Sequence, residues 1–187
     1  KKRIGLLFDL TKMAYEQQSA LEKLTKLQSP NGGFMWFAGM PENRFITQYI
    51  VQGIGHLNQL NVIDISKDKN LSQVVEKAIT YLDGKMQEDF ESIKKYDKDY
   101  LKTNHLDYDV IQYLYMRSFF KENKIDKKYS EAYNYYLDQA KKYWNENKNL
   151  QMKALLSMIL YRNNESKLAK TIIESFRQNA INSEEMG

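Results

Sequence analysis

The amino-acid sequence predicts an all-α fold built of αα-hairpins in two layers. The 187 residues include only 8 glycines and 2 prolines, too few turn residues for the many short strands of a sandwich or barrel. Apolar side chains recur at spacings of three and four through most of the chain, which is the period of an amphipathic helix. Helices that are apolar on nearly all sides alternate with helices that have one apolar stripe, as expected of two packed layers.

Seven helical segments are predicted, with approximate ranges 6–27, 44–60, 71–93, 107–120, 130–145, 150–161 and 165–180. The first is supported by apolar residues at helical spacing, and the second is apolar around much of its circumference. The third begins near Leu71, where Asn70 can cap the helix and Gln73 lies three residues later, a loose capping box.

The remaining four helices repeat this alternation. The fourth and sixth are again apolar nearly all round, whereas the fifth and seventh each have one apolar stripe. In the fifth, Tyr133, Tyr135, Tyr136, Tyr143 and Trp144 have the aromatic spacing of tetratricopeptide-type hairpins, and at helical spacing such rings are expected in the core. The breaks between helices contain residues that can serve as N-caps: Asn104, Asn147, Asn149, Asn163 and Asn164.

The alternation assigns the second, fourth and sixth helices to an inner layer and the third, fifth and seventh to an outer layer. Gly53 and Gly55 fit an inner position, because glycine lets neighbouring backbones approach closely. Two architectures have this alternation, an open solenoid and a closed α/α toroid. The uneven spacing of the helices disfavours a regular tandem repeat.

Composition excludes several classes of function. The net charge of +4 comes from 28 basic and 24 acidic residues that are interleaved, so no nucleic-acid surface is predicted. The absence of cysteine excludes a disulfide scaffold, a zinc ribbon and a cysteine nucleophile. The longest apolar run, 34–40, is far shorter than a membrane span. Because the chain begins with Lys1, we expect a processed product or an excised segment.

Few residues suggest catalysis. His56 is expected to be a satisfied polar residue of the core, and His105 to precede the fourth helix beside a capping Asp107. Asp107 and Asp109 are two positions apart and therefore diverge on a helix. No phosphate-binding loop or metal-binding motif is present in the sequence, so no catalytic, cofactor or metal site is predicted.

The strongest local signal is segment 30–41, which contains both prolines and three of the eight glycines. Asn31-Gly32-Gly33 favours a tight turn with positive φ, and Gln28 can hydrogen-bond the backbone of this turn. Three aromatic residues follow at once: Phe34, Trp36 and Phe37. We expect them to pack over the end of the helical layers as a wedge that closes a helix–helix connection. The alternative is a ligand cage built from the same rings.

These residues resemble the Gln-x-x-x-Gly-x-aromatic repeat of α/α-toroid proteins such as terpene cyclases. Over a longer stretch they are similar to the thioester-domain region of the α2-macroglobulin and complement superfamily, and most of all to large bacterial α2-macroglobulin-like proteins. The family pattern is Asp/Asn-Gly-x-Phe/Tyr-x-x-Phe, then a helix containing Thr-x-Tyr/Phe-Val. The matching residues are Gln28, Asn31, Gly32, Gly33, Phe34, Trp36, Phe37, Thr47 and Tyr49.

This resemblance implies that residues 1–187 form one helical domain, an excised part of the α/α toroid of a much larger protein. It implies a structural module, not catalytic by itself, of an inhibitor that traps endopeptidases. Its partners would be proteases and the parent's other domains, and the parent would be exported to the periplasm or cell surface, with a lipid anchor on the parent as one form of attachment. The family's Cys-x-x-Gln thioester cannot form in a chain without cysteine.

The resemblance also draws attention to His105, because complement-type members place a histidine that assists thioester transfer at this rim. Its neighbours Asn104, Leu106 and Asp107 do not match that motif closely. Two further functions remain open: a tetratricopeptide-like scaffold that binds proteins or peptides, and an α/α-toroid enzyme that acts on a carbohydrate or an isoprenoid.

Overall fold

The structure, a computed structural model, describes residues 12, 13, 15, 16 and 19–178 of the chain. Within them, residues 19–26 are helical, and the later elements are α2 (Arg44–Gln59), α3 (Lys69–Tyr96), α4 (Tyr108–Arg117), α5 (Lys127–Tyr143), the 3₁₀ helix η1 (Trp144–Glu146), α6 (Leu150–Arg162) and α7 (Ser166–Gln178). The described residues contain two isolated β-bridges but no strand, so the all-α prediction is confirmed. Parts of the predicted helices 6–27 and 165–180 lie outside the described residues.

Five helices begin at a side chain that accepts a hydrogen bond from an amide of the first turn: Asn43, Asp68, Asp107, Asp126 and Asn149. Such an acceptor satisfies an amide that has no partner within the helix. Capping by Asp107 and Asn149 agrees with the prediction. The predicted cap at Asn70 is wrong, because Asp68 caps α3 and the helix begins at Lys69. A carboxylate at this position also interacts favourably with the helix dipole.

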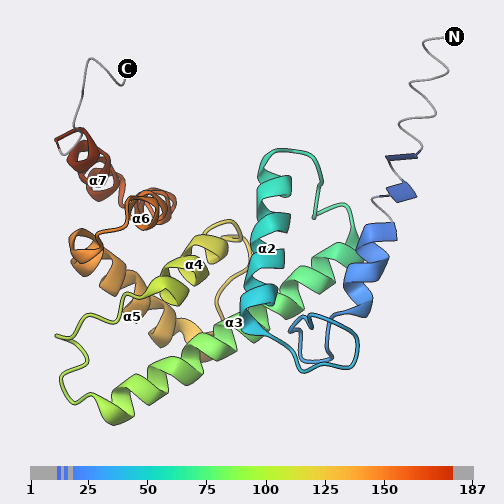
Figure 1. Ribbon diagram of the computed structural model, residues 1–187, viewed down its shortest axis with the longest axis horizontal. Coiled ribbons are helices and arrows are strands. Elements are labelled where there is room, and N and C mark those ends of the chain that lie inside the picture. The colour runs from blue at the N-terminus through green and yellow to red at the C-terminus, as the bar shows by residue number, and fades with distance from the viewer. Residues whose placement is uncertain (1–11, 14, 17–18, 179–187) are drawn as a thin grey trace, which may run out of the picture.

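Figure 1 shows how the helices are arranged. α2, α4 and α6 lie next to one another in chain order, and α3 packs beside α5. α3 also packs against α2, and α7 packs against α6. α4 therefore lies between α2 and α6 and also contacts α3 and α5.

Burial follows from this packing. Along α4, residues 110, 111 and 113–117 are all buried, as predicted for a helix that is apolar nearly all round. The same prediction is wrong for α2 and α6, because each exposes large apolar side chains on one side. Phe45 and Tyr49 are exposed on α2, and Tyr161 is exposed on α6. The wide apolar pattern therefore leaves one side of α2 and of α6 largely exposed.

The aromatic side chains of α5 do pack in the core. Tyr135, Tyr136 and Tyr143 are buried, and Tyr133 and Trp144 are half-buried against the same cluster. The ring of Tyr135 lies 4.8 Å from that of Phe90 on α3, measured between centroids. The predicted core role of these tyrosines is confirmed, and the contact attaches α5 to α3.

The two glycines of α2 differ in their surroundings. A Cβ atom added at Gly55 would lie 2.9 Å from the Cβ atom of Phe119, so glycine is required for this approach. A Cβ atom added at Gly53 would meet no atom within 4 Å. The predicted close approach is therefore confirmed at Gly55 and wrong at Gly53, which lies on the exposed side of α2.

This contrast gives a matched pair of substitutions. Gly53→Ala is expected to raise the free energy of unfolding by about 1 kcal/mol, because alanine has the higher helix propensity. Gly55→Ala is expected to lower it by about 1–3 kcal/mol, because the added methyl group overpacks the contact with Phe119. Urea denaturation monitored by circular dichroism measures both, and equal changes of the same sign would contradict this account.

Candidate functional site

The connection between residue 26 and α2 contains most of the motif residues. Gly32 has a φ of +98°, and the amide of Gly33 donates to Oδ1 of Asn31 at 3.0 Å, which closes the tight turn. Nε2 of Gln28 donates to the carbonyl of Gly32 at 3.0 Å and to that of Val74 in α3 at 2.8 Å. Gln28 thus binds the turn backbone, as expected, and also ties the turn to α3.

Phe34 anchors the far side of this connection. Its side chain is fully buried in the core. Its amide donates to Oγ1 of Thr47 at 2.7 Å, and the Thr47 hydroxyl donates to the carbonyl of Asn43 at 2.7 Å. Thr47 is itself fully buried. These two motif residues therefore join the connection to the first turn of α2, which is the structural role expected of a wedge.

The other two aromatic residues of the motif do not pack in this wedge, and the prediction that they cover the end of the layers is wrong. Trp36 is 48% exposed and Phe37 is 70% exposed. Phe34 alone enters the core. After Met35, which pairs with Glu42 in an isolated bridge, the backbone turns through residues 36–40, so the following rings lie outside the core.

Trp36 instead stacks on the exposed side of α2. Its ring centroid lies 6.5 Å from that of Phe45, and Phe45 lies 6.4 Å from Tyr49, with interplanar angles of 19° and 13°. Phe45 is 52% exposed and Tyr49 is 65% exposed. We call Trp36, Phe45 and Tyr49 the aromatic ladder. It brings two of the predicted motif residues together on an exposed surface.

His56 lies on the same helix, seven residues beyond Tyr49. It is half-buried rather than enclosed in the core. Its ring centroid lies 4.6 Å from that of Phe119, and its Nε2 lies 3.4 Å from the hydroxyl oxygen of Tyr115. Burial and the nearby positive charge of Arg162 lower the pKa of His56 below its ordinary value. The neutral imidazole is therefore the form that the fold favours.

The lowered pKa of His56 sets a pH dependence. Because the folded chain binds this proton less readily than the unfolded chain, His56 contributes stability above its ordinary pKa of about 6.5, and this is lost as the pH falls through the folded value. Arg162→Gln removes the repelling charge, so we expect the pKa of His56 to rise in an NMR titration. Arg177→Gln is the control, and a rise there but not in Arg162→Gln would contradict the assigned cause.

His105 lies in a different environment, in the loop before α4, where it faces α5. Its Nδ1 lies 2.6 Å from the Tyr135 hydroxyl oxygen and its Nε2 lies 3.4 Å from Oδ2 of Asp97. Its amide donates to Oε1 of Gln139 at 2.8 Å. These contacts fasten the loop to α5, next to the Asp107 cap of α4.

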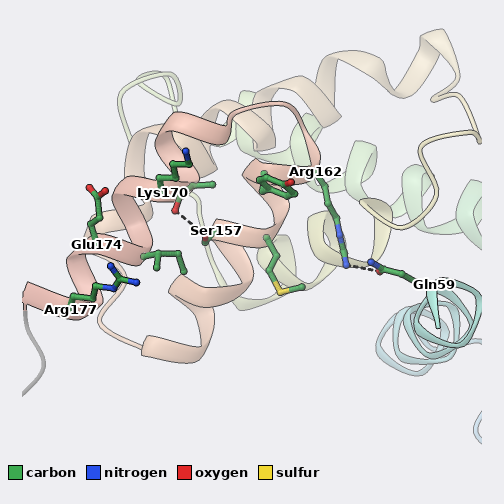
Figure 2. A pocket seen from close by; sticks show the side chains of 10 residues that line it. Gln59, Ser157, Arg162, Lys170, Glu174 and Arg177 are labelled. Atoms are coloured by element: carbon green, nitrogen blue, oxygen red, sulfur yellow. Dashed lines mark hydrogen bonds between the residues drawn. The ribbon is translucent and has the colours of Figure 1, made fainter.

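A groove between α6 and α7 is the second exposed feature (Figure 2). Its volume is about 570 Å³. Its lining combines apolar, cationic and hydroxyl-bearing side chains from both helices and from the end of α2: Gln59, Ser157, Met158, Tyr161, Arg162, Ala169, Lys170, Ile173, Glu174 and Arg177. Sequence reasoning did not find this groove. The signal that could have indicated it is the spacing of Lys170, Glu174 and Arg177, which places three charged groups on one side of α7.

Arg162 connects the groove to α2 and α4. Nη1 of Arg162 donates to the Ser118 hydroxyl at 2.9 Å, and Nη2 donates to Oε1 of Gln59 at 2.8 Å. Its guanidinium carbon lies 4.0 Å from the ring centroid of Phe119, within range of a cation–π interaction. The guanidinium is therefore fixed by α2 and by the end of α4 before any ligand arrives.

Comparison with known proteins adds no relative. No family model matches the chain, and no match was found among curated proteins or solved structures. None of the helices in the described ranges combines the length and hydrophobicity that a membrane crossing requires. Among the side chains that the structure describes, no group of three or more histidine, cysteine, aspartate or glutamate residues is placed to hold a metal ion.

Proposed function

We propose that this chain is a structural, non-catalytic helical module of a bacterial α2-macroglobulin-like protease inhibitor, and that its helices form part of an α/α toroid. The aromatic ladder carries this proposal. Three stacked, exposed rings are typical of a surface that another protein layer covers. The ladder directly follows the Asn-Gly-x-Phe turn and includes the tyrosine of Thr-x-Tyr, the two patterns on which the family resemblance rests.

In this proposal the remaining domains of the parent protein cover the ladder, and proteases are partners of the parent and not of this module alone. The parent would be exported to the periplasm or the cell surface. Four of the motif residues make hydrogen bonds within the connection or to the helices beside it: Gln28, Asn31, Gly32 and Thr47. In this proposal they have a structural role, and covalent chemistry belongs to other parts of the parent protein. These motif residues support the fold of the connection.

A toroid enzyme is less well supported by the residues on the inner helices. Glycoside hydrolysis uses a pair of carboxylates that face the scissile bond. The sequences of α2, α4 and α6 together contain one carboxylate, Asp109. This composition favours a structural or binding module over an enzyme that acts on a carbohydrate.

The coding sequence on either side of this segment tests the proposal. We expect β-rich domains of the macroglobulin type around it, and their absence would contradict the proposal. In the full-length product, Phe45→Ser with Tyr49→Ser is expected to loosen the module from its neighbours and increase limited proteolysis between residues 34 and 60. Phe37→Ser is the matched control, because Phe37 is more exposed than either ring and makes no ring contact within the described residues.

His105 provides a separate test within the same protein. Its contacts with Tyr135, Asp97 and Gln139 support a structural role. We therefore expect His105→Ala to leave covalent capture of a target protease by the full-length parent unchanged. A loss of capture in a variant that remains folded would instead assign His105 to the chemistry of the inhibitor.

A second candidate function is a tetratricopeptide-like scaffold that binds peptides. The observation that favours it is the open groove between α6 and α7, which exposes apolar side chains from both helices. Peptide binding by the isolated chain tests this function.

A further inference from the structure

We propose that the groove between α6 and α7 binds an acidic peptide segment that carries apolar side chains. This inference rests on the second candidate function, the peptide scaffold, and assigns the chemistry of its ligand. It is independent of the macroglobulin proposal.

The floor of the groove is apolar and accessible. Met158 and Tyr161 from α6 and Ile173 from α7 are all exposed. They lie across from one another where α6 packs against α7, above the buried Ala169. Apolar side chains of a bound segment would cover these groups and remove them from water, which is the main favourable contribution to such binding.

The rim of the groove is positively charged. Arg162, Lys170 and Arg177 line it, and Glu174 is the single acidic residue in the lining. Within the described residues, no carboxylate lies within ion-pair distance of any of these three cations. By contrast, Lys141 on α5 pairs with both Asp138 and Glu165. The groove therefore has an excess of positive charge that a carboxylate-bearing ligand would neutralise.

The arrangement of these cations indicates an elongated ligand. Arg162 lies at one end of the groove and Arg177 at the other, with Lys170 and Glu174 between them (Figure 2). α7 has 13 residues, which corresponds to about 20 Å, the length of about six extended residues. A segment of this length with carboxylates near both ends and apolar residues between them matches the positions of the charges and of the floor.

The guanidinium of Arg162 is already held in one orientation by its neighbours. These are Gln59, Ser118 and the ring of Phe119. Burial lowers the pKa of this group, since part of its hydration is lost. A carboxylate from the ligand would restore the lost charge stabilisation with a guanidinium that is already oriented, which reduces the entropy lost on binding.

Binding of fluorescein-labelled, end-capped peptides to the whole chain tests this inference by fluorescence anisotropy. The probe is a segment of about six residues with glutamates near both ends and leucines between them, and its matched control replaces every glutamate with glutamine. We expect the glutamate peptide to bind about tenfold or more tightly than the glutamine peptide, with an affinity that falls as salt is raised. Equal binding of the two peptides would overturn the acidic specificity but leave the scaffold function intact, and no binding of either would overturn both.

Variants locate the binding to the groove. Lys170→Gln with Arg177→Gln is expected to weaken binding of the glutamate peptide about tenfold, because two exposed charge contacts are lost. Ile173→Asp is expected to weaken it further, since the substitution places a negative charge on the apolar floor. Lys167→Gln removes a charge from α7 outside the groove and is the control. A loss with Lys167→Gln that equals the loss with the double variant would overturn the proposal.

Discussion

Arg117→Met is expected to lower the free energy of unfolding by about 3–5 kcal/mol. The side chains of Arg117 and Asp83 are exposed by only 3% and 4%, and Nε of Arg117 lies 3.2 Å from Oδ1 of Asp83. Nη1 and Nη2 of Arg117 also donate to the carbonyls of Phe120 and Asn123, at 2.8 and 2.7 Å. Methionine would leave a buried carboxylate without its cation and would remove the side-chain donor from both carbonyls, of which that of Phe120 still accepts from the amide of Asn123 at 3.1 Å.

The loss in this variant should depend on pH in a defined direction. Burial raises the pKa of Asp83, and the charge of Arg117 opposes that rise. Without Arg117 the pKa of Asp83 is therefore higher still, and protonation neutralises the uncompensated charge. We expect the difference in unfolding free energy between wild type and Arg117→Met to shrink as the pH is lowered from 7 toward 5.

Urea denaturation at several pH values measures both effects, and a double variant supplies the control. Asp83→Leu combined with Arg117→Met removes the carboxylate and the cation together, so it should be less destabilised than Arg117→Met alone. Leu114→Ala, in the same buried helix but without polar partners, should show a loss that does not change with pH. A pH-independent loss in Arg117→Met would contradict the role of Asp83.

The Asp83–Arg117 pair shows where sequence reasoning ends. The two residues are 34 positions apart and belong to different helices, so neither the helical period nor any motif places them together. The sequence did predict that α4 is buried, because nearly every position of that helix is apolar. The burial of a polar residue in such a helix can be predicted from the sequence. The identity of its partner cannot, because it depends on how α3 packs against α4.

The exposed surfaces were also beyond the reach of the sequence pattern. Phe34 and Trp36 are two positions apart and equally apolar, yet one is fully buried and the other stacks on the outside of α2. An apolar pattern states which residues are able to pack and not whether another element covers them. The same reason explains why α2 is less buried than predicted and why the groove was missed, since the groove is formed where α6 packs against α7.

The turn residues, by contrast, were predictable because their conformation is local. Asn31-Gly32-Gly33 indicated a tight turn with positive φ, and Gly32 has that conformation. Gln28 was expected to bind this turn and does so. Its second hydrogen bond, to the carbonyl of Val74, joins elements distant in the sequence and was not predictable.

Gly32→Ala is expected to lower the free energy of unfolding by about 2–5 kcal/mol. A Cβ atom at this position would lie 2.1 Å from the carbonyl oxygen of Lys77 in α3. Backbone atoms of a helix cannot move aside as the end of a flexible side chain can. The added methyl group therefore overpacks this contact and forces the turn to shift. The φ of +98° adds strain of about 1–2 kcal/mol for any residue with a Cβ atom.

Gly39→Ala separates these two contributions. Gly39 also has a positive φ, +87°, but a Cβ atom there would meet no atom within 4 Å. It should therefore show the backbone strain alone, about 1–2 kcal/mol. Thermal or urea denaturation of both variants gives the difference, which measures the close approach of the turn to α3. If the free energy of unfolding falls by the same amount in both variants, the close approach to the Lys77 carbonyl is not the reason that glycine is required at position 32. A larger loss at Gly32 would show that the motif glycine is required by packing between the connection and the helix below it.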